Sequence, residues 1–594
     1  MDTFVLQAIA AELSENLLGA RLERISQADA HTVVFFFSGA RREKRALLMS
    51  ADPAHPRVYL TADPPPSLPE APTFCRALRK HLGGLRLTRA AAGEWERVLQ
   101  FSFEPGGGGP RSSDSFALMA EVMGRWSNLV LLNGATGEIL EARRFVPPGP
   151  HTPRPLERGG GYQLPPEQKK RNPGALTREA LKEMIREEVP GSADQEELAR
   201  WLVRSVAGVS PALARELARA SNAEESWAGA ADALMGFVES YQKKEFAPAW
   251  VLGAGGAPVG LSAARIPGVD ADSYRAFDSM NEAADAFYGR LVKDARLGEG
   301  KKRASRTLRR AGDKVRAAIE GVRRDLASAD EAEDVLRKGE LLLAHLDEVE
   351  EKAVAVSVSA EDGPIDIALD PRLTPSENAQ KYFRRYKKLK RRASTALARL
   401  QEMEEEERFI GALAFDLEAA DAVEDVLSVE EALAGAGYAG RKGARRAKEA
   451  RTKGRPAARA KPYRRFVSPA GWEVIVGRNA MGNDEMLKRV GRASDTWLHA
   501  RGVPGSHVLL RRGGDGPPTE PDPETLAQAA AFAAWFSRGR TDSRLTVAYL
   551  PFSRIRKPKG RRPGQVLIGA HETILVDPDA GKRLSEEWEE INRD

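Results

Sequence analysis

The chain has 594 residues, with 91 lysines plus arginines against 85 aspartates plus glutamates, a net charge of +6 and a single cysteine. At roughly 100–200 residues per domain, this length predicts several structural units rather than one core. Cys75 alone excludes a disulfide scaffold and a cysteine-built zinc or iron–sulfur site, and it suggests a reducing compartment. The most apolar stretches, Thr32–Phe37 and Ala527–Phe536, are far shorter than the ~20 residues of a membrane-spanning helix. No positively charged segment followed by an apolar run opens the chain, so we expect a cytoplasmic protein.

Residues 1–175 are predicted to form an α+β domain. Helical periodicity extends from Phe4 to Leu18, and a second helix is expected at about Pro72 to Leu82. Short apolar runs between turn signals predict strands at Leu22–Ile25, Val33–Phe37, Ala46–Met49, Val58–Leu60, Val98–Phe103, Phe116–Val122 and Leu129–Leu132. The stretch 147–173 is dense in proline and glycine, so we expect an irregular connection there.

Residues 176–270 are predicted to form a helix-hairpin-helix region. Gly208 lies just before Ser210 and Pro211, two residues that cap and start a helix. Backbone N–H groups at such a start can hold a phosphate, although the same pattern is at least as often plain capping. The glycine-rich stretch Gly253–Gly260 is interpreted as a loop, because we see no strand leading into it and no clear helix after it.

Residues 271–434 are predicted to form an antiparallel coiled-coil arm. Two long helices are expected, from about 275 to 345 and from about 376 to 420, and Val315, Ile319 and Val322 show the apolar spacing of such a helix. Between them, at about 350–375, alternating side chains and the turn Asp362-Gly363-Pro364 predict a small β tip. The simplest arrangement folds the second helix back on the first.

The positive charge is concentrated in blocks. Residues 301–324 carry ten basic against two acidic side chains, 381–392 eight against none, and 441–465 twelve against one. Such blocks are typical of proteins that bind phosphate backbones, while the alternative is that they are solvated helix faces and linkers. Residues 435–462 have almost no large apolar side chains, and we expect a basic flexible linker there.

Residues 463–594 are predicted to form a compact α/β domain with one helix from about Pro523 to Ser537. Strands are expected at Trp472–Val476, Thr496–Ala500, His507–Arg511, Leu545–Tyr549, Val566–Ile568 and Thr573–Val576.

The sequence contains no recognisable set of reacting groups. We find no histidine, cysteine or carboxylate set at metal-ligand spacing, no Walker loop, no dinucleotide-binding glycine pattern and no nucleophile elbow. The segment from Ser494 to Val508 instead combines side chains that can stack on bases with Arg501, which can bind phosphate. The alternative interpretation makes Trp497 a core aromatic and His507 an ordinary strand residue. Between a binding protein and an enzyme, these features favour the binding protein.

Five separated motifs resemble those of the NFACT family. They are Phe74–His81, Glu121–Asn128, Lys338–Leu342, Leu373–Phe383 and Asp495–Arg511, in this order along the chain. The resemblance implies a multidomain α+β fold with an N-terminal glycosylase-like α+β domain, a helix-hairpin-helix, a long antiparallel coiled-coil arm and a C-terminal α/β RNA-binding domain.

The resemblance also implies a function in ribosome quality control. Members of this family bind split large ribosomal subunits, contact rRNA, and recognise the tRNA that still carries the nascent chain. Bacterial members recruit alanyl-tRNA, so that an alanine tail is added without messenger RNA. The ribosome makes the peptide bond, so we expect a monomeric factor on the ribosome with no enzymatic activity, cofactor, metal or membrane partner.

Three groups of contact residues follow from the resemblance. The expected tRNA contacts are Glu96, Arg97, Arg79, Lys80, Arg125, Ser127 and Asn128. The expected RNA contacts of the C-terminal domain are Asp495, Trp497, His499, Arg501, Gly505, Ser506 and His507. The expected rRNA contacts on the arm are Lys381, Arg384, Arg385, Lys387 and Lys388.

Two departures from related patterns limit what is expected. Glycosylases with a similar N-terminal domain need an N-terminal proline followed by glutamate, whereas this chain begins Met1-Asp2-Thr3, so glycosylase chemistry is not expected. Family members that bind tRNA carry Asp-Arg where this chain has Glu96-Arg97, and the carboxylate therefore stands one methylene further out. Two alternatives stay open: a rescue factor that binds the large subunit without tailing, and a surface adhesin that binds fibronectin.

Overall fold

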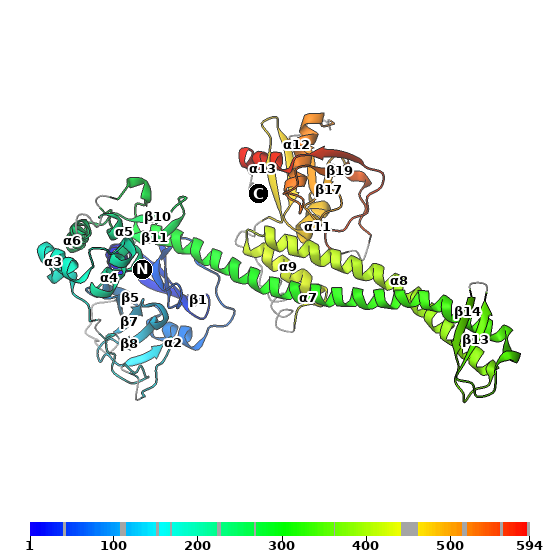
Figure 1. Ribbon diagram of the computed structural model, residues 1–594. Coiled ribbons are helices and arrows are strands. Elements are labelled where there is room, and N and C mark those ends of the chain that lie inside the picture. The colour runs from blue at the N-terminus through cyan, green and yellow to red at the C-terminus, as the bar shows by residue number, and fades with distance from the viewer. Residues whose placement is uncertain are drawn as a thin grey trace. The chain divides into compact units, whose positions relative to one another are not determined.

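The computed structural model divides into two compact units, Met1–Lys293 and Asp294–Asp594 (Figure 1). It describes residues 1–39, 43–106, 115–149, 152, 154–166, 169–221, 227–266, 269–360, 363–440, 461–513, 520–558 and 562–590. Within these ranges, none of the helices combines the length and the apolar composition needed to cross a membrane.

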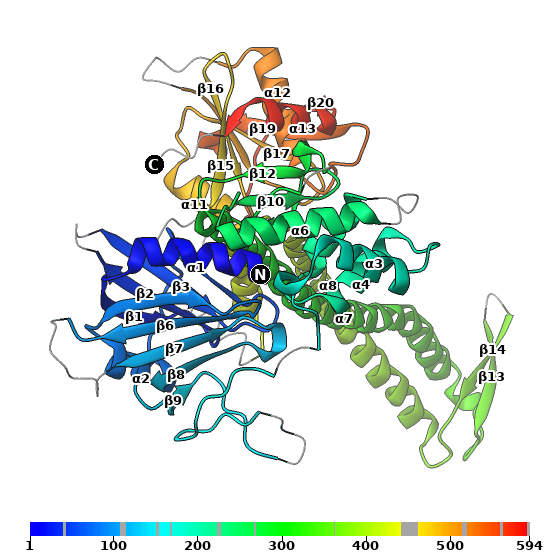
Figure 2. The same cartoon turned by 90° about the vertical axis from the view of Figure 1, so that its left-hand side faces the viewer.

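The first unit is built on a nine-stranded antiparallel sheet in the order β4-β3-β2-β1-β5-β6-β7-β8-β9 (Figure 2). Its strands are β1 (Arg21–Gln27), β2 (Thr32–Ser38), β3 (Lys44–Ser50), β4 (Arg57–Thr61), β5 (Arg86–Ala92), β6 (Val98–Glu104), β7 (Phe116–Glu121), β8 (Asn128–Asn133) and β9 (Ile139–Ala142). Helix α1 (Thr3–Leu17) packs against β5 and β4, and α2 (Thr73–Leu82) packs against β1. The predicted α+β domain is confirmed, although β5 and β9 were not anticipated.

Four helices follow the sheet: α3 (Arg178–Glu188), α4 (Gln195–Ser205), α5 (Pro211–Arg219) and α6 (Ala228–Lys243). Helices α4 and α5 pack on each other and are joined by a short turn, as predicted for a helix-hairpin-helix. A three-stranded sheet comes next, with β10 (Ala249–Leu252), β11 (Pro258–Ser262) and β12 (Tyr274–Ala276).

The interpretation of Gly253–Gly260 as a loop is right for residues 253–257, but the expectation that no strand leads into it is wrong. Strand β10 ends at Leu252, residues 253–257 form the hairpin turn, and Gly260 lies in β11. Gly255 and Gly256 have φ values of +85° and +76°, which favour glycine, so the glycines serve the turn. A strand of four residues is too short to show a clear alternation in sequence.

The arm consists of two long antiparallel helices. Helix α7 (Met280–Ala344), in which the second unit begins, runs beside α8 (Pro375–Ala419), and β13 (Ala355–Ala360) and β14 (Gly363–Ala368) form the predicted tip (Figure 1). Leu389 packs with Val335 near the tip, while Lys301 Nζ donates to the carbonyl of Glu418 at the other end, 3.1 Å away. Helix α9 (Val423–Gly435) packs back on α8. Asp362 of the predicted turn lies outside the described residues.

The C-terminal domain is a seven-stranded antiparallel sheet in the order β20-β19-β17-β18-β16-β15-β21. Its elements are β15 (Tyr463–Val467), β16 (Trp472–Gly477), α11 (Ala480–Arg489), β17 (Thr496–Ala500), β18 (Val508–Arg512), α12 (Pro523–Trp535), β19 (Leu545–Pro551), β20 (Glu572–Val576), α13 (Pro578–Glu587) and β21 (Glu589–Glu590). Helix α12 covers one face, where Phe532 packs on Phe466.

One predicted strand of this domain is not formed, and most of the predicted linker before it lies outside the described residues. The strand predicted at Val566–Ile568 is absent from the described residues, where only Leu567 forms an isolated bridge, to Arg556. The run is apolar but has no neighbouring strand to complete a ladder, and Leu567 and Ile568 remain exposed. Of the predicted basic linker, residues 441–460 lie outside the described part of the chain, so the linker stays a prediction.

Candidate nucleic-acid interface

A cavity of about 690 Å³ lies in the first unit, between the segment that leads into β6 and the start of α5. Two continuous stretches line it, residues 94–97 and residues 207–211. The other lining residues are Asp2, Thr3, Leu164, Pro165, Lys170, Asn172 and Val203. The structure thus brings two predicted features together, the Glu96-Arg97 pair and the Gly208–Pro211 helix start. Of the other predicted tRNA contacts, none lines this cavity.

The start of α5 is shaped by a cap and a glycine. Ser210 Oγ accepts a hydrogen bond from Leu213 N at 3.1 Å, and Pro211 occupies the first helical turn. Gly208 has a φ of +78°, and a Cβ there would lie 3.2 Å from the Thr3 side chain. The positive N-terminal end of this nine-residue helix therefore lies directly at the cavity wall.

Asp2 joins this helix start to α1. Its Oδ1 accepts from Val5 N at 2.9 Å and caps α1, while its Oδ2 accepts from Ser210 Oγ at 3.0 Å. Burial raises the pKa of the Asp2 carboxyl, while these hydrogen bonds and the charge of Arg97 act in the opposite direction. Sequence reasoning used Asp2 only to exclude glycosylase chemistry and missed this positioning role.

Two cations line the cavity. Burial lowers the pKa of Arg97. The pKa of Lys170 is lowered too, mainly by burial and to a smaller extent by the nearby charge of Arg97. Among the described residues, neither side chain has an ion-pair partner within 4 Å, although Asp2 and Glu96 act on Arg97 at longer range. The carboxylates of Asp2, Glu94 and Glu96 line the same cavity, so its charge is mixed. The groups in it that suit an anion such as a phosphate are Arg97, Lys170 and the N-terminus of α5. Lys170 lies in the proline- and glycine-rich connection, and no motif in the sequence marked it as a candidate contact residue.

Trp95 forms a rigid wall of the cavity. Its indole stacks on Tyr241 with ring centres 4.4 Å apart and meets Phe4 edge-on at 5.8 Å. Its backbone has a φ of +55°, an unfavourable value for a bulky residue. This packing fixes the chain just before Glu96 and Arg97.

The Glu121–Asn128 motif contains both buried and exposed predicted contacts. Ser127 and Asn128 are buried, and their side chains hold the surrounding backbone, while Arg125 is exposed. The motif adjoins the cavity segment directly, because Val122 N donates to the carbonyl of Arg97 at 2.8 Å. Arg79 and Lys80 lie apart on α2, where Arg79 Nε donates to the carbonyl of Ile25.

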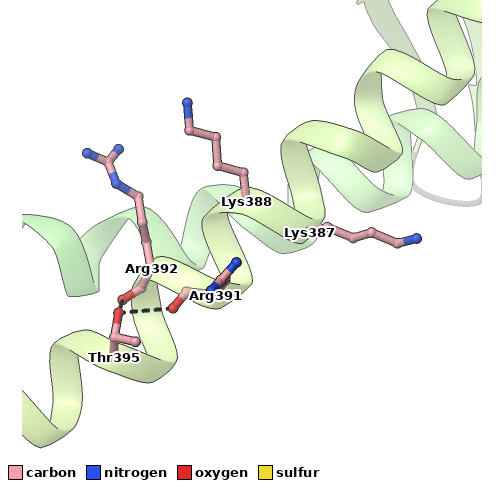
Figure 3. Close-up of a pocket in the computed structure, with 5 residues that line it drawn as sticks. All are labelled: Lys387, Lys388, Arg391, Arg392 and Thr395. Carbon is pink, nitrogen blue, oxygen red and sulfur yellow. Dashed lines mark hydrogen bonds between the residues drawn. The ribbon is translucent and has the colours of Figure 1, made fainter.

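On α8, exposed cations surround a shallow depression of about 450 Å³ (Figure 3). It is lined by Lys387, Lys388, Arg391, Arg392 and Thr395, and in the figure the long side chains of Lys388 and Arg392 extend away from the helix in the same direction. The predicted contacts Lys387 and Lys388 belong to it, Arg384 is exposed nearby on the same helix, and Arg391 and Arg392 are additions. Lys381 and Arg385 instead pair with Asp370 at 3.1 Å and Glu331 at 3.9 Å.

In the C-terminal domain most predicted RNA contacts are buried. Trp497 is 2% exposed and packs in the core, stacked on the half-buried His499 and edge-on to the buried His507. Burial lowers the pKa of His499, and burial and His499 hold that of His507 well below its usual range, so both rings are neutral at pH 7.

Three further members of this group hold the framework. Asp495 is buried and forms an ion pair of 2.6 Å with the buried Arg511. Ser506 is also buried, and a Cβ on Gly505 would lie 2.7 Å from that of Ser537, so this position requires glycine. Of the seven predicted residues of this domain, only Arg501 is exposed, and it is therefore the one placed to reach a ligand directly.

Carboxylates near the end of α8 contact the C-terminal domain, which sequence reasoning did not anticipate. Asp416 Oδ2 accepts from Ala480 N at the start of α11 at 2.9 Å, and Asp421 pairs with Arg464 and Arg478. Burial raises the pKa of Asp416 to about 7, with the charge of Asp425 adding to the effect. Within the described ranges, no group of three or more His, Cys, Asp or Glu residues is placed to hold a metal ion.

Comparison with known proteins finds two family models that together match most of the chain. The sequence model of the NFACT N-terminal and middle domains matches residues 2–452, and that of the NFACT protein RNA binding domain matches residues 462–569. The Rqc2 homolog RqcH of Bacillus subtilis (strain 168) is 28% identical over 600 residues, covering 98% of each chain. The Rqc2 homolog RqcH of Streptococcus pneumoniae (strain ATCC BAA-255 / R6) is 27% identical over 597 residues, covering 98% of this chain and 99% of its own. The solved N-terminal part of the fibronectin/fibrinogen-binding protein from Streptococcus suis covers 49% of this chain and 99% of its own, with 23% identity and a TM-score of 0.39.

Proposed function

The chain belongs to the NFACT family, and from this premise we propose that it is a cytoplasmic ribosome quality-control factor that binds RNA and catalyses no reaction itself. It binds split large ribosomal subunits that carry peptidyl-tRNA and recruits a further tRNA, which we take to be alanyl-tRNA. The ribosome then adds alanine to the stalled chain without a template. The relatives named Rqc2 homolog RqcH, matched over nearly their whole length, support this proposal.

The observation that carries the proposal is the cavity at Arg97. Its two cations lack ion-pair partners among the described residues, and the positive end of α5 borders the same space. Phosphates of a tRNA could be contacted there by Arg97, by Lys170 and by the N–H groups at the start of α5. Contact by exposed cations of α8 with rRNA, and by Arg501 with RNA, belongs to the same proposal.

The test is the RNA that copurifies with the full chain. Wild type should recover one tRNA species and large-subunit rRNA, while Arg97→Ala should lose the tRNA and keep the rRNA. Arg200→Ala is the matched control, because Arg200 is an exposed arginine of the same unit that lies outside the cavity. A wild-type purification free of both RNAs would overturn the proposal.

Whether tailing occurs is tested on the product. Stalled nascent chains from wild-type cells should carry alanine tails by mass spectrometry, and those from Arg97→Ala cells should not. Untailed chains in both strains, with rRNA still bound, would favour the rescue factor without tailing. The adhesin alternative requires the chain on the cell surface. Fractionation that finds it only in the cytosol counts against an adhesin.

A further inference from the structure

Trp126 is exposed in a way that no other tryptophan of the chain is. All nine tryptophans lie in the described ranges, and Trp126 is 61% exposed while the other eight are buried or half-buried. A single exposed apolar residue needs no explanation by itself. The surroundings of Trp126 distinguish it.

Two arginines flank the indole. The guanidinium carbon of Arg125 lies 5.0 Å from the ring centre, and that of Arg144 lies 5.8 Å from it. Both arginines are exposed, and in the described part of the chain neither has a carboxylate within ion-pair distance. Both guanidinium groups lie over the ring, which is still largely exposed, and no carboxylate of the described residues neutralises them.

Buried polar groups hold this patch in place. Trp126 lies in a 3₁₀ turn, η2 (Gly124–Trp126), which is closed by the Ser127 amide donating to the carbonyl of Gly124 at 3.0 Å. Ser127 Oγ accepts from Met123 N at 2.8 Å. The buried Asn128 donates from Nδ2 to the carbonyl of Arg144 at 2.8 Å and accepts from the amide of Arg144 at 3.0 Å. A preformed site loses little conformational entropy on binding.

We propose that Trp126 is a stacking platform for an unpaired nucleobase, with Arg125 and Arg144 binding the adjoining phosphates. The inference rests on the proposed function, because it assumes that the first unit binds RNA. Bases stack on aromatic faces whatever their identity, and neighbouring arginines add phosphate contacts, which is a common way of holding single-stranded RNA.

An RNA ligand suits this patch better than a protein. Exposed tryptophan and arginine also occur in protein interfaces, but there the charged groups at the centre are usually paired on binding. Here two exposed cations beside the indole have no carboxylate at ion-pair distance among the described residues. The same segment is attached to the backbone that carries Arg97, because Val122 N donates to the carbonyl of Arg97. The phosphates of an RNA would neutralise both arginines of the patch.

The test compares variants of the full chain in binding to a tRNA, to a short unstructured oligoribonucleotide and to a blunt RNA duplex of the same length. Trp126→Ala should weaken binding of the unstructured RNA by about 5- to 100-fold, the effect of losing one stacked base. Duplex binding should change much less. Because stacking neutralises no phosphate, the dependence of affinity on salt should stay as in wild type, whereas Arg125→Ala should make it shallower.

Two controls keep the result interpretable. Trp126→Phe retains a smaller aromatic face and should restore most of the affinity. Leu18→Ala removes another exposed apolar side chain of the same unit, 50% exposed, and should have no effect on RNA binding. Circular dichroism of each variant should match wild type, because the exposed indole contributes little to the fold.

The outcomes separate this inference from the proposed function. If Trp126→Ala binds unstructured RNA like wild type while Arg97→Ala loses tRNA, the stacking site is wrong and the proposed function stands. If neither variant changes RNA binding, both are overturned. If Trp126→Ala leaves RNA binding intact but loses a protein that copurifies with wild type, the patch is a protein-docking surface and the inference is wrong.

Discussion

Ser210 donates a hydrogen bond to Asp2 across 208 positions of sequence, with Oγ and Oδ2 3.0 Å apart. Asp2 caps α1 and Ser210 caps α5, so two helix caps share one contact. Both residues line the cavity that contains Arg97. The position of the α5 N-terminus relative to Arg97 therefore depends on a buried carboxylate at the start of the chain.

Asp2→Ala should loosen α5. The change removes the cap of α1 and the bond to Ser210, and a lost cap alone costs about 1 kcal/mol, with a range of about 0.5–2. Asp2→Asn keeps an oxygen that accepts from Val5 N, and its Nδ2 can donate to Ser210 Oγ in place of the bond that Oδ2 accepts, so it should lie much closer to wild type than Asp2→Ala. Hydrogen exchange at the first amides of α5 should be faster in Asp2→Ala only. Equal exchange in both variants would mean that Asp2 does not position the helix.

The contact between α8 and the C-terminal domain should weaken as pH rises. The pKa of Asp416 is about 7 in the folded chain against an ordinary value of 3.8, so the folded state binds the proton more tightly. The contribution of Asp416 to the free energy of unfolding is therefore fully present below about pH 4. It falls between about pH 4 and pH 7, and above that it no longer changes with pH. Asp416→Asn still accepts from Ala480 N and cannot ionise.

Thermal unfolding across this pH range provides the measurement. A pKa raised from 3.8 to about 7 corresponds to about 4 kcal/mol of stability. At about 2–4 °C per kcal/mol for a domain of some 150–250 residues, we expect the melting temperature of wild type to fall by roughly 10 °C from this group. In Asp416→Asn this part of the pH dependence should disappear. Asp421→Asn is the control, because it weakens the pairs with Arg464 and Arg478 and leaves the titration of Asp416 in place. An identical pH profile in Asp416→Asn and wild type would contradict the assignment.

Local sequence patterns predicted much of the fold. The strands β2–β4 contain apolar runs, and α7 and α8 repeat an apolar spacing over many turns, so these elements were expected within a few residues. Strand β5 was missed because its sequence, Arg-Leu-Thr-Arg-Ala-Ala-Ala, has little strand propensity and is held by its neighbours β1 and β6.

The candidate site was only partly predictable. The cap at Ser210 and the basic Arg97 were visible in the sequence, the first from turn chemistry and the second from the family resemblance. That they lie in one cavity with Asp2 and Lys170 was not visible in the sequence, because it depends on tertiary contacts between distant segments. For Trp497 the sequence allowed two interpretations, and the structure places its ring in the core.

Asp495 and Arg501 should respond differently to substitution. Asp495→Ala leaves the buried Arg511 without its ion-pair partner, which typically costs about 3–5 kcal/mol, so the C-terminal domain should lose stability. Arg501→Ala removes an exposed side chain and should leave stability unchanged, within about 0.5 kcal/mol. Urea unfolding monitored in the C-terminal domain separates the two. RNA binding should fall in Arg501→Ala although the fold is intact. If Arg501→Ala binds RNA normally, the exposed arginine is not a contact.

The cations of α8 should control the salt dependence of ribosome binding. Lys387, Lys388, Arg391 and Arg392 surround one depression, and within the described residues none of them has a carboxylate at ion-pair distance (Figure 3). Each phosphate contact contributes about 0.7–0.9 to the slope of log affinity against log salt, so changing all four to glutamine should reduce the slope by about 3. Affinity for the large subunit should fall most at low salt, where those contacts count most.

The control changes Arg316 and Arg323 of α7 to glutamine, because these already pair with Asp313 and Glu320 on their own helix. Since their charge is compensated within the chain, the control should keep the wild-type slope, and an equal loss in both variants would show that net charge, rather than this face of α8, governs binding.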